Sequence, residues 1–278
     1  MKIFLTGGSG FVGKNLFEFY SPNFDVVLYK RGEDITERLN QEKPEFIINS
    51  AAEIYQTESM FDSNLVLVNE ILSYCVRSDN LKRFIQIGSS SEYGRKSNPS
   101  SERDSLEPQT IYEGTKAAAS LLCVAHAKSF SLPIVVARPY SVYGPHEKPH
   151  RLFPKLIDSF FKNKPMKLHQ GWHDFIYIKD FVRGIDILLN EEESKVRGDI
   201  VNFGSGKQHS NFEIYAIIKS MLRRDGVVEL EESFLKVFES LTWICNTDYA
   251  KSKYGFQTNF DIEAGIFDLL KENRHALI

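Results

Sequence analysis

Tyr112 and Lys116 are four positions apart in a segment, 112–131, whose apolar pattern predicts a helix. Residues at i and i+4 share one face of a helix, so we expect the Lys116 ammonium beside the Tyr112 phenol. A cation within about 4–6 Å favours the phenolate and lowers the pKa of a tyrosine from its usual value near 10. The pair therefore predicts a tyrosine that works as an acid and base near neutral pH. The spacing by itself also fits an ordinary surface Tyr–Lys pair.

A hydroxyl-rich segment, 89–94, follows an apolar run that predicts a strand at 83–88. Ligands of parallel sheets bind beyond the carboxyl ends of the strands. Other predicted strands end just before Gly7, Ala51 and Pro139. We therefore expect one cleft, in which the Ser89 hydroxyl and Tyr112 bind the same substrate oxygen.

The chain begins with a predicted strand at 2–6, a glycine-rich turn and a helix predicted over 11–20. Two glycine spacings are present: Gly8, Gly10 and Gly13 match G-x-G-x-x-G, and Gly7, Gly10 and Gly13 match G-x-x-G-x-x-G. Glycines in such a turn let the backbone approach a pyrophosphate and the helix lie close to its strand. Free amides at the helix N-terminus then bind the phosphates. The turn predicts a dinucleotide site.

Short apolar strands are predicted at 2–6, 25–29, 45–50, 83–88 and 133–138, with helices between them that include 60–78 and 112–131. This alternation predicts a parallel sheet covered by helices on both faces. The expected fold class is α/β, a Rossmann doubly wound parallel sheet with a smaller mixed C-terminal substrate-binding lobe.

The pattern loosens after residue 144, where prolines surround a helix predicted at 152–163. A strand near 174–178 and a helix at 180–190 rejoin the first pattern. A strand from about 200, a turn at 204–206 and helices near 211–223 and 260–273 follow. We therefore assign 1–144 and about 171–203 to a dinucleotide-binding domain, and about 145–170 and 204–278 to an interleaved substrate-binding lobe.

The composition excludes several classes of function. The 278 residues carry a net charge of −3, which gives no electrostatic reason to expect nucleic acid or an acidic membrane as a partner. No apolar run approaches the roughly 20 residues of a membrane span, and the first strand leaves no room for a signal peptide. We expect a cytoplasmic protein.

Neither the cysteines nor the histidines form a recognisable reactive or metal-binding pattern. No C-x-x-C pair is present, and we expect buried thiols at Cys75, Cys123 and Cys245. The helical H-x-x-x-H spacing of a metal-binding pair is missing from the group His146, His150, His169 and His173. We therefore expect no metal site.

These features together resemble the extended short-chain dehydrogenases/reductases of the nucleotide-sugar epimerase/dehydratase type, over nearly the whole chain. The motifs that carry the resemblance are Thr6 to Gly13, Asp34-Ile35, Asn49 to Ala52, Ser89 to Gly94, Tyr112 with Lys116, Arg138 to Pro145 and His173 to Asp180. The resemblance implies an NAD(P)-dependent enzyme, a nucleotide-sugar substrate and a homodimer that pairs through helices such as 60–78 and 112–131.

The resemblance also implies roles for single residues. Tyr112 is the implied acid/base, Lys116 its electrostatic partner and a ribose ligand, and Ser89 the orienting hydroxyl. The implied neighbours are Asp34 and Ile35 for the adenine, Ala51 and Ala52 for the cofactor backbone, and Tyr140 to Val142 for the nicotinamide. The cofactor-binding set that we expect is Thr6, Gly7, Ser9, Gly10, Phe11, Val12, Gly13, Lys30, Arg31, Asp34, Ile35, Ala51, Ala52, Tyr112, Lys116, Tyr140 and Val142.

Two departures from the family pattern bear on the reaction. Sugar 4,6-dehydratases of this family carry an Asp-Glu pair where this chain has Ser90 and Ser91. Serine is a poor acid or base at neutral pH, so dehydration is disfavoured, unless Glu92 takes over one position later. The family's Arg-Asp-Phe motif begins here with His173, and a neutral imidazole does not replace a bidentate guanidinium. Substrate binding is therefore expected from Ser90, Ser91, Arg151, Lys155 and His173, with the diphosphate at Arg151 or Lys155.

The end of the second predicted strand bears on the choice of cofactor. An acidic residue there binds the ribose 2′-hydroxyl of NAD, but Asp25 stands at the start of the strand and Lys30 and Arg31 stand at its end. Two cations suit a 2′-phosphate, although they also fit solvated loop residues. We favour NADP over NAD.

The expected function is NADPH-dependent reduction of a nucleotide-linked 4-keto-6-deoxy sugar, with hydride delivered to the ketone carbon and the proton supplied by Tyr112. An alternative is a nucleotide-sugar epimerase or dehydratase that retains NAD. A third hypothesis is a non-catalytic NADP-sensing regulator on the same fold, against which the presence of Ser89, Tyr112 and Lys116 argues.

Overall fold

The computed structural model describes residues 1–231 and 242–275. Within these ranges the largest sheet has six strands, all parallel, in the order β2 (Asp25–Leu28), β1 (Lys2–Thr6), β3 (Phe46–Asn49), β4 (Arg83–Ile87), β5 (Ile134–Pro139) and β9 (Asp199–Phe203). The order reverses between β1 and β3, as in a doubly wound sheet. The predicted strands at 2–6, 25–29, 45–50, 83–88 and 133–138 are confirmed.

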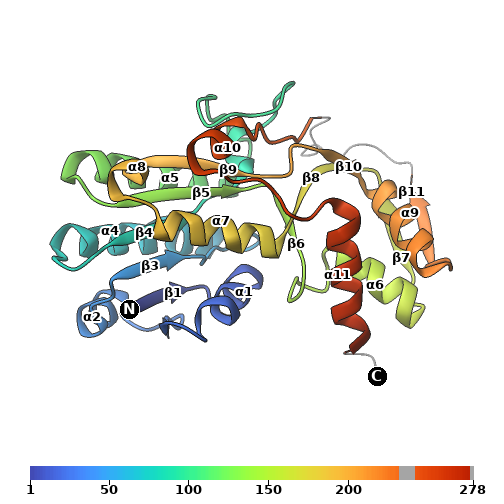
Figure 1. Ribbon diagram of the computed structural model, residues 1–278, viewed down its shortest axis with the longest axis horizontal. Coiled ribbons are helices and arrows are strands. Elements are labelled where there is room, and N and C mark those ends of the chain that lie inside the picture. The colour runs from blue at the N-terminus through green and yellow to red at the C-terminus, as the bar shows by residue number, and fades with distance from the viewer. Residues whose placement is uncertain (232–241, 276–278) are drawn as a thin grey trace.

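Helices cover both faces of this sheet (Figure 1). Alternate strand residues point to opposite faces. Ile3, Leu5 and Ile85 pack with α1 (Phe11–Tyr20) and α7 (Ile178–Asn190). Phe4 and Phe84, one position along, pack on the other face with α2 (Ile35–Glu42), α4 (Leu67–Arg77) and α5 (Ile111–Phe130). Both faces are therefore apolar, which explains why the strands are continuous hydrophobic runs.

Most of the remaining elements gather at one end of the molecule, beyond the carboxyl ends of the sheet (Figure 1). One small sheet has the order β10 (Gln208–Ser210), β8 (Trp172–Tyr177), β6 (Ser141–Tyr143), and another pairs β11 (Val228–Glu231) with β7 (Met166–His169). The helices α6 (Leu152–Lys162), α9 (Asn211–Leu222) and α11 (Ile262–His275) accompany them. Of two shorter helices, α8 (Glu193–Val196) precedes β9 in the sequence, and α10 (Asp248–Tyr254) packs near β9 in space.

The prediction that the strand near 174–178 rejoins the first pattern is wrong. The strand exists as β8, but it pairs with β6 and β10 and not with the six-stranded sheet. Its run of buried residues does not identify the partner strand, since either sheet offers an apolar face. The helix that follows, α7, does cover the large sheet. The domain boundaries themselves stay a prediction.

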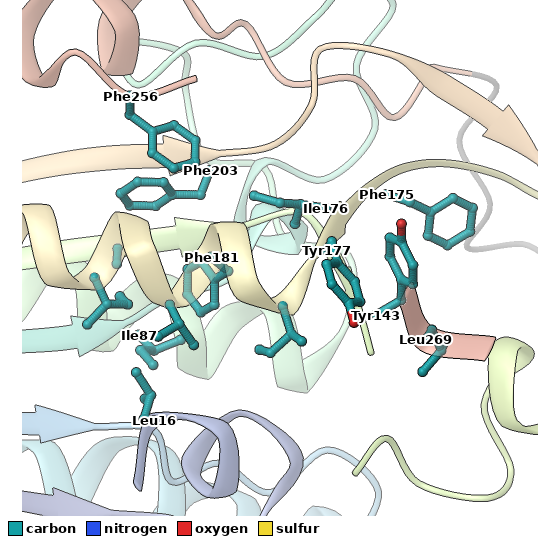
Figure 2. Packing of buried hydrophobic residues seen from close by; sticks show 14 of the residues in the cluster. Leu16, Ile87, Tyr143, Phe175, Ile176, Tyr177, Phe181, Phe203, Phe256 and Leu269 are labelled. Atoms are coloured by element: carbon teal, nitrogen blue, oxygen red, sulfur yellow. The ribbon is translucent and has the colours of Figure 1, made fainter. Parts of the chain in front are cut away.

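Aromatic side chains join the two parts of the fold (Figure 2). Phe203 of β9 packs edge-on against Phe181 of α7 and against Phe256, with ring centroids 5.8 and 4.8 Å apart. Tyr143 of β6 packs on Tyr177 of β8, at 5.3 Å. All of these rings are buried and belong to one hydrophobic cluster that also includes the large sheet. The small sheets are therefore held against the large one by continuous core packing.

The predicted helix at 60–78 is interrupted. It consists of α3 (Thr57–Phe61), a π-helical turn at Asp62–Val66 and α4. Asn64 lies in this turn, is buried, accepts a hydrogen bond from the Glu53 amide at 2.7 Å and donates to the Thr115 hydroxyl of α5 at 3.0 Å. Thr115 in turn donates to the Tyr112 carbonyl at 2.9 Å. The turn thus fastens the start of α5, which carries Tyr112.

Candidate active site

The glycine turn between β1 and α1 is restricted by its own backbone. Gly7 has φ +71° and a Cβ on it would lie 2.6 Å from the Ala51 amide nitrogen. A Cβ on Gly13 would lie 2.1 Å from the Gly7 carbonyl oxygen. At Gly8 the same test meets only the end of the Leu28 side chain, which is able to move. The two spacings read from the sequence therefore differ in constraint, and the set at 7, 10 and 13 is the one that the fold requires.

Buried polar side chains brace this turn from below. Thr6 at the end of β1 hydrogen-bonds Asn49 at the end of β3, and the Asn49 amide donates to Gln86 of β4 at 2.8 Å. Gln86 donates to the Ile87 carbonyl at 3.0 Å, and the Lys116 ammonium donates to the same oxygen at 2.5 Å. The chain of bonds joins the glycine turn to α5 and satisfies polar groups that would be costly to bury alone.

Ser89 is held by a capping box at the turn Ser90–Tyr93. Its amide donates to the Glu92 carboxylate at 2.7 Å, and its hydroxyl accepts from the Ser91 amide at 3.2 Å. The other Glu92 oxygen is ion-paired with Arg138 at 2.7 Å, and both side chains are fully buried. Arg138 also donates to the Tyr93 hydroxyl at 2.5 Å. Glu92 is therefore a structural carboxylate that positions Ser89, and it is committed to Arg138.

Tyr112 and Lys116 lie on one face of α5, but they do not interact as the sequence predicted. Burial raises the pKa of Tyr112 above its usual value, and the Ser89 hydrogen bond and the Arg151 charge offset this only in part. Burial lowers the pKa of Lys116, whose ammonium is bonded to the Ile87 carbonyl. The prediction that Lys116 brings Tyr112 toward phenolate is wrong for this state of the protein. Tyr112 is a phenol here, suited to give a proton.

One cleft of about 450 Å³ brings the predicted residues together, a size typical of small-molecule sites. One side, which we call the glycine wall, is Gly10, Phe11, Val12, Gly13, Ser50 and Ala52. The floor includes Ser89, Ser90, Tyr112, Lys116, Tyr140 and Val142. The other side, which we call the loop wall, is Glu147, Lys148, Arg151, Trp172, His173 and Trp243. The residues that begin α1 therefore line the same cleft as Tyr112.

The loop wall carries perturbed titratable groups. Burial lowers the pKa of His173 to about 4, and the nearby Arg151 lowers it further, so the imidazole is neutral at neutral pH. Its Nδ1 lies 3.4 Å from the Ser141 hydroxyl. Burial raises the pKa of Glu147 to about 7, against the opposing effect of Arg151. Arg151 itself is half exposed, and its charge acts on both of these groups.

The structure leaves several predicted residues outside the cleft lining. Thr6 is buried beneath the turn, Gly7 packs on the end of β3, and Ser9 is exposed at the tip. Ile35 is in the core and Asp34 caps α2. The residues that lie elsewhere are Ala51, which bonds Thr6 and Asn49, Ser91, whose hydroxyl is 2.7 Å from that of Ser89, and Lys155, which lines a neighbouring pocket with His150 and Lys164.

Lys30 and Arg31 are exposed at the end of β2. The Arg31 guanidinium lies 4.0 Å from the Glu53 carboxylate, and the Lys30 amide bonds Glu33 at 3.0 Å. Neither cation lines the cleft of about 450 Å³, which ends short of this strand.

Sequence reasoning missed six residues that line the cleft, namely Ile54, Tyr55, Glu147, Lys148, Trp172 and Trp243. The chain has two tryptophans, and both are in this lining. The Tyr55 hydroxyl lies 2.6 Å from His150 Nε2, which links the segment after β3 to the loop wall. No motif contains these residues, and their common position comes from chain segments far apart. The scarcity of tryptophan was the one sequence signal that pointed to two of them.

The carboxylates of the segment 173–180 have structural partners. Asp174 is buried and accepts from the amides of Ser205, Gly206 and Cys245 at 2.7–2.9 Å. Asp180 accepts from the Asn259 and Phe260 amides at 2.8 and 2.9 Å. These two carboxylates therefore fasten the C-terminal segments to β8 and α7.

The three cysteines are unpaired and buried, as predicted, and burial raises the pKa of each thiol. Within 1–231 and 242–275, no group of three or more His, Cys, Asp and Glu side chains has the arrangement of a metal site. Of the helices in the described part of the chain, none has the length and apolarity to cross a membrane.

A family model, the NAD dependent epimerase/dehydratase family, matches residues 3–204. The chain is 31% identical over 193 residues to an uncharacterized UDP-glucose epimerase, YtcB, of Bacillus subtilis, a match that covers 68% of this chain and 59% of that relative. The chain thus spans about three fifths of the length of that curated protein.

Solved structures share the fold. A dTDP-glucose 4,6-dehydratase of Bacillus anthracis, in complex with NAD, superposes with a TM-score of 0.86 at 21% identity, over 99% of this chain and 97% of the other. A UDP-glucuronic acid 4-epimerase of Bacillus cereus, in complex with UDP-glucuronic acid and NAD, superposes with a TM-score of 0.86 at 22% identity, over 99% and 100%.

Proposed function

This chain belongs to the NAD-dependent epimerase/dehydratase family, and from that premise we propose an enzyme that oxidises or reduces one carbon of a nucleotide-linked sugar. The observation that carries the proposal is the single cleft that contains the N-terminus of α1 together with Ser89, Tyr112 and Lys116. A helix N-terminus suits a pyrophosphate, and a buried phenol bonded to a serine hydroxyl suits proton transfer to a sugar oxygen.

A nicotinamide dinucleotide fits the glycine wall. The missing Cβ atoms at Gly7 and Gly13 let the backbone close tightly, and Phe11, Val12 and Gly13, the first residues of α1, line the cleft. These residues would hold the pyrophosphate. When bound, the nicotinamide supplies the hydride chemistry that no side chain of this protein offers.

Tyr112 starts as a phenol, and we propose that it donates its proton to the ketone oxygen of the sugar as that carbon is reduced. Ser89 hydrogen-bonds the same oxygen and stabilises the charge that develops on it. Lys116, although bonded to Ile87, lies one helical turn from Tyr112 and lowers the cost of a transient phenolate.

Within this class we favour reduction of a 4-keto-6-deoxy sugar over dehydration. Ser90 and Ser91 occupy the positions of the dehydratase acid pair, and Glu92 is committed to Arg138 and to the Ser89 amide. The floor beside Ser89 therefore carries no available carboxylate among the described residues. The raised pKa of Tyr112 also supports a proton donor in the resting enzyme.

We further propose NADPH as the reductant, because Lys30 and Arg31 stand at the end of β2 and are exposed to a ligand there. A 2′-phosphate would compete with Glu53 for the Arg31 guanidinium, which is 4.0 Å from that carboxylate. The second candidate, an epimerase that retains NAD, is favoured by the match to the UDP-glucose epimerase relative.

Cofactor content tests the two candidates. The reductase should be purified with little bound cofactor and should oxidise NADPH when a nucleotide-linked 4-keto-6-deoxy sugar is added. The epimerase would be the correct assignment if the purified protein carried stoichiometric NAD and interconverted UDP-glucose and UDP-galactose. It would then also oxidise no NADPH with any keto sugar.

We also propose a homodimer that pairs through α4 and α5. Large apolar side chains are exposed on these helices and the turn before them, at Phe61, Val66, Val76 and Leu121. Exposed apolar residues grouped in this way are typical of protein interfaces. Light scattering should give a dimer for the wild type and a monomer for Leu121→Glu; a wild-type monomer would exclude this interface.

A further inference from the structure

Glu147 stands in the loop between β6 and α6 and has an unusual environment. Its side chain is only 5% exposed, although the residues that follow it in the loop are exposed. Oε1 lies 3.5 Å from the Arg151 Nε. Over residues 1–231 and 242–275, Oε2 is buried and has no hydrogen-bond partner. The residue lines the cleft that contains Tyr112.

The loop that carries Glu147 is held in place by contacts with α1. The Asn15 amide of α1 donates to the Pro145 carbonyl at 3.0 Å, and the imidazole of His146 is 2.8 Å from the Glu18 carboxylate. Glu147 caps no helix, since the residue that begins α6 has no side-chain cap. A buried acceptor without a donor loses its hydrogen bonds to water and gains none from the protein, which destabilises the folded state. Such a group in a cleft wall is explained by a ligand that supplies the donor.

The contacts of Arg151 indicate that Glu147 lies at the end of the cleft where Tyr112 is. Its charge is close enough to lower the pKa of both Tyr112 and His173, and it is the ion-pair partner of Glu147. The carboxyl group therefore lies near the acid–base tyrosine, where the sugar would be, and not at the far end of a long nucleotide site.

We propose that Glu147 is a substrate-binding residue whose free carboxyl oxygen accepts a hydrogen bond from a hydroxyl of the sugar, while Arg151 holds the carboxyl in place. The inference rests on the proposed function, since it assumes a nucleotide sugar in the cleft. A carboxylate at this point attracts a neutral sugar with free hydroxyls and repels a sugar that carries its own carboxylate. Glu147 thereby sets a preference for neutral hexoses over uronic acids.

Ligands that differ only in the sugar test this assignment. Binding of UDP-glucose, UDP-glucuronic acid and UDP to the cofactor-loaded protein is measured by tryptophan fluorescence, because both tryptophans line the cleft. Glu147→Ala should weaken UDP-glucose about tenfold or more and leave UDP unchanged. Glu147→Gln, which keeps the shape, should lose less UDP-glucose affinity and gain affinity for UDP-glucuronic acid. The control is Glu193→Gln, an exposed carboxylate of α8 paired with Arg197, which should change nothing.

The pH profile separates a substrate contact from a structural role. The raised pKa of Glu147, about 7, predicts UDP-glucose binding that changes between pH 6 and 8 in the wild type and is flat in Glu147→Gln. Facing Glu147 is Arg151, which stays charged over this range.

Four results would overturn the assignment. Equal loss of UDP and UDP-glucose in both variants would make Glu147 a structural partner of Arg151. An unchanged pH profile in Glu147→Gln would remove it from the binding step. Water release from the sugar by the wild type, abolished in Glu147→Gln, would make it a proton-transfer residue instead. A wild type that binds UDP but neither UDP-glucose nor dTDP-glucose would refute the proposed function, and the Glu147 inference with it.

Discussion

The two sides of the cleft are built differently. The glycine wall comes mainly from the turn between β1 and α1, with Ser50 and Ala52 after β3, and a Cβ on Gly13 would come within 2.1 Å of the Gly7 carbonyl oxygen. The loop wall is side chains: it combines residues of the loop before α6, of β8 and of the segment at Trp243. A surface made of backbone atoms suits a ligand that is common to a whole family, because it does not depend on side-chain identity. A surface made of side chains is able to vary from one family member to another with the substrate. We therefore expect cofactor binding and substrate choice to be separable in this protein.

The largest effect is expected where the two walls meet, at Tyr112. Tyr112→Phe removes the proton donor and should reduce turnover about 100- to 10,000-fold, while NADPH and the nucleotide sugar still bind. Steady-state rates and fluorescence titrations measure the two quantities. If Tyr112→Phe retained its turnover, Tyr112 would not be the proton donor, whichever wall binds the cofactor and whichever binds the substrate.

A change in the glycine wall should affect stability and cofactor together. Gly13→Ala places a methyl group against the Gly7 carbonyl and should cost about 1–3 kcal/mol of unfolding free energy, with a loss of cofactor affinity of tenfold or more. The matched control is Gly114→Ala on α5, which meets no atom within 4 Å and should stabilise by up to about 1 kcal/mol. Normal cofactor binding by Gly13→Ala would mean that the turn does not hold the dinucleotide.

A change in the loop wall should affect substrate alone. Arg151→Gln removes a half-exposed cation and should weaken nucleotide-sugar binding about 10- to 100-fold, without changing the melting temperature or the affinity for NADPH. Calorimetric titration of both ligands checks this. A parallel loss of NADPH affinity would show that the two walls are not separable.

A smaller effect is expected at the end of β2. Exposed charges are screened by water and salt, so replacing Lys30 and Arg31 together by Gln should weaken NADPH by about tenfold and leave NADH unchanged. Equal changes in the affinities for NADPH and NADH would refute the 2′-phosphate assignment. The side chains at the end of β2 would then play no part in the choice of cofactor.

The smallest effect is a pH dependence on the loop wall. His173 is held neutral, with its pKa lowered to about 4, whereas the unfolded chain takes up the proton near 6.5. The unfolded state therefore binds more protons between these values, and stability falls as the pH drops through that window. Between pH 6.5 and 5.5 the loss should be about 1 kcal/mol, and smaller in His173→Gln. Denaturant titrations at the two pH values measure it.

The glycine turn of the cleft was predictable from the sequence. Gly7, Gly10 and Gly13 were recognisable because a strand, a tight turn and a helix follow one another within thirteen residues, and each requirement is local. The strands of the large sheet were predictable for a similar reason, since burial on both faces makes them apolar throughout. Ser89 and Tyr112 followed from their positions after a predicted strand and at the start of a predicted helix.

The loop wall was predicted only in part. Arg151 and His173 were predicted as substrate-binding residues and do line the cleft. Lys155 of α6 was predicted as well, but it lies in the neighbouring pocket. Glu147 belonged to no motif, and its significance comes from burial, which the sequence around it does not indicate. The partner of β8 was predicted wrongly because an apolar strand fits either sheet.

The sequence by itself determined the family and the glycine turn and singled out Tyr112 as the proposed acid–base residue, since these depend on residue types at short spacing. Only the tertiary structure decided the charge state of that tyrosine. Spacing places Lys116 beside Tyr112, but the ammonium bonds the Ile87 carbonyl, and desolvation raises the pKa of the phenol. Tertiary structure also decided that Glu92 is committed to Arg138 and that Glu147 has a free oxygen in the cleft. Burial and hydrogen bonding between distant segments control these properties, and neither is encoded in local spacing.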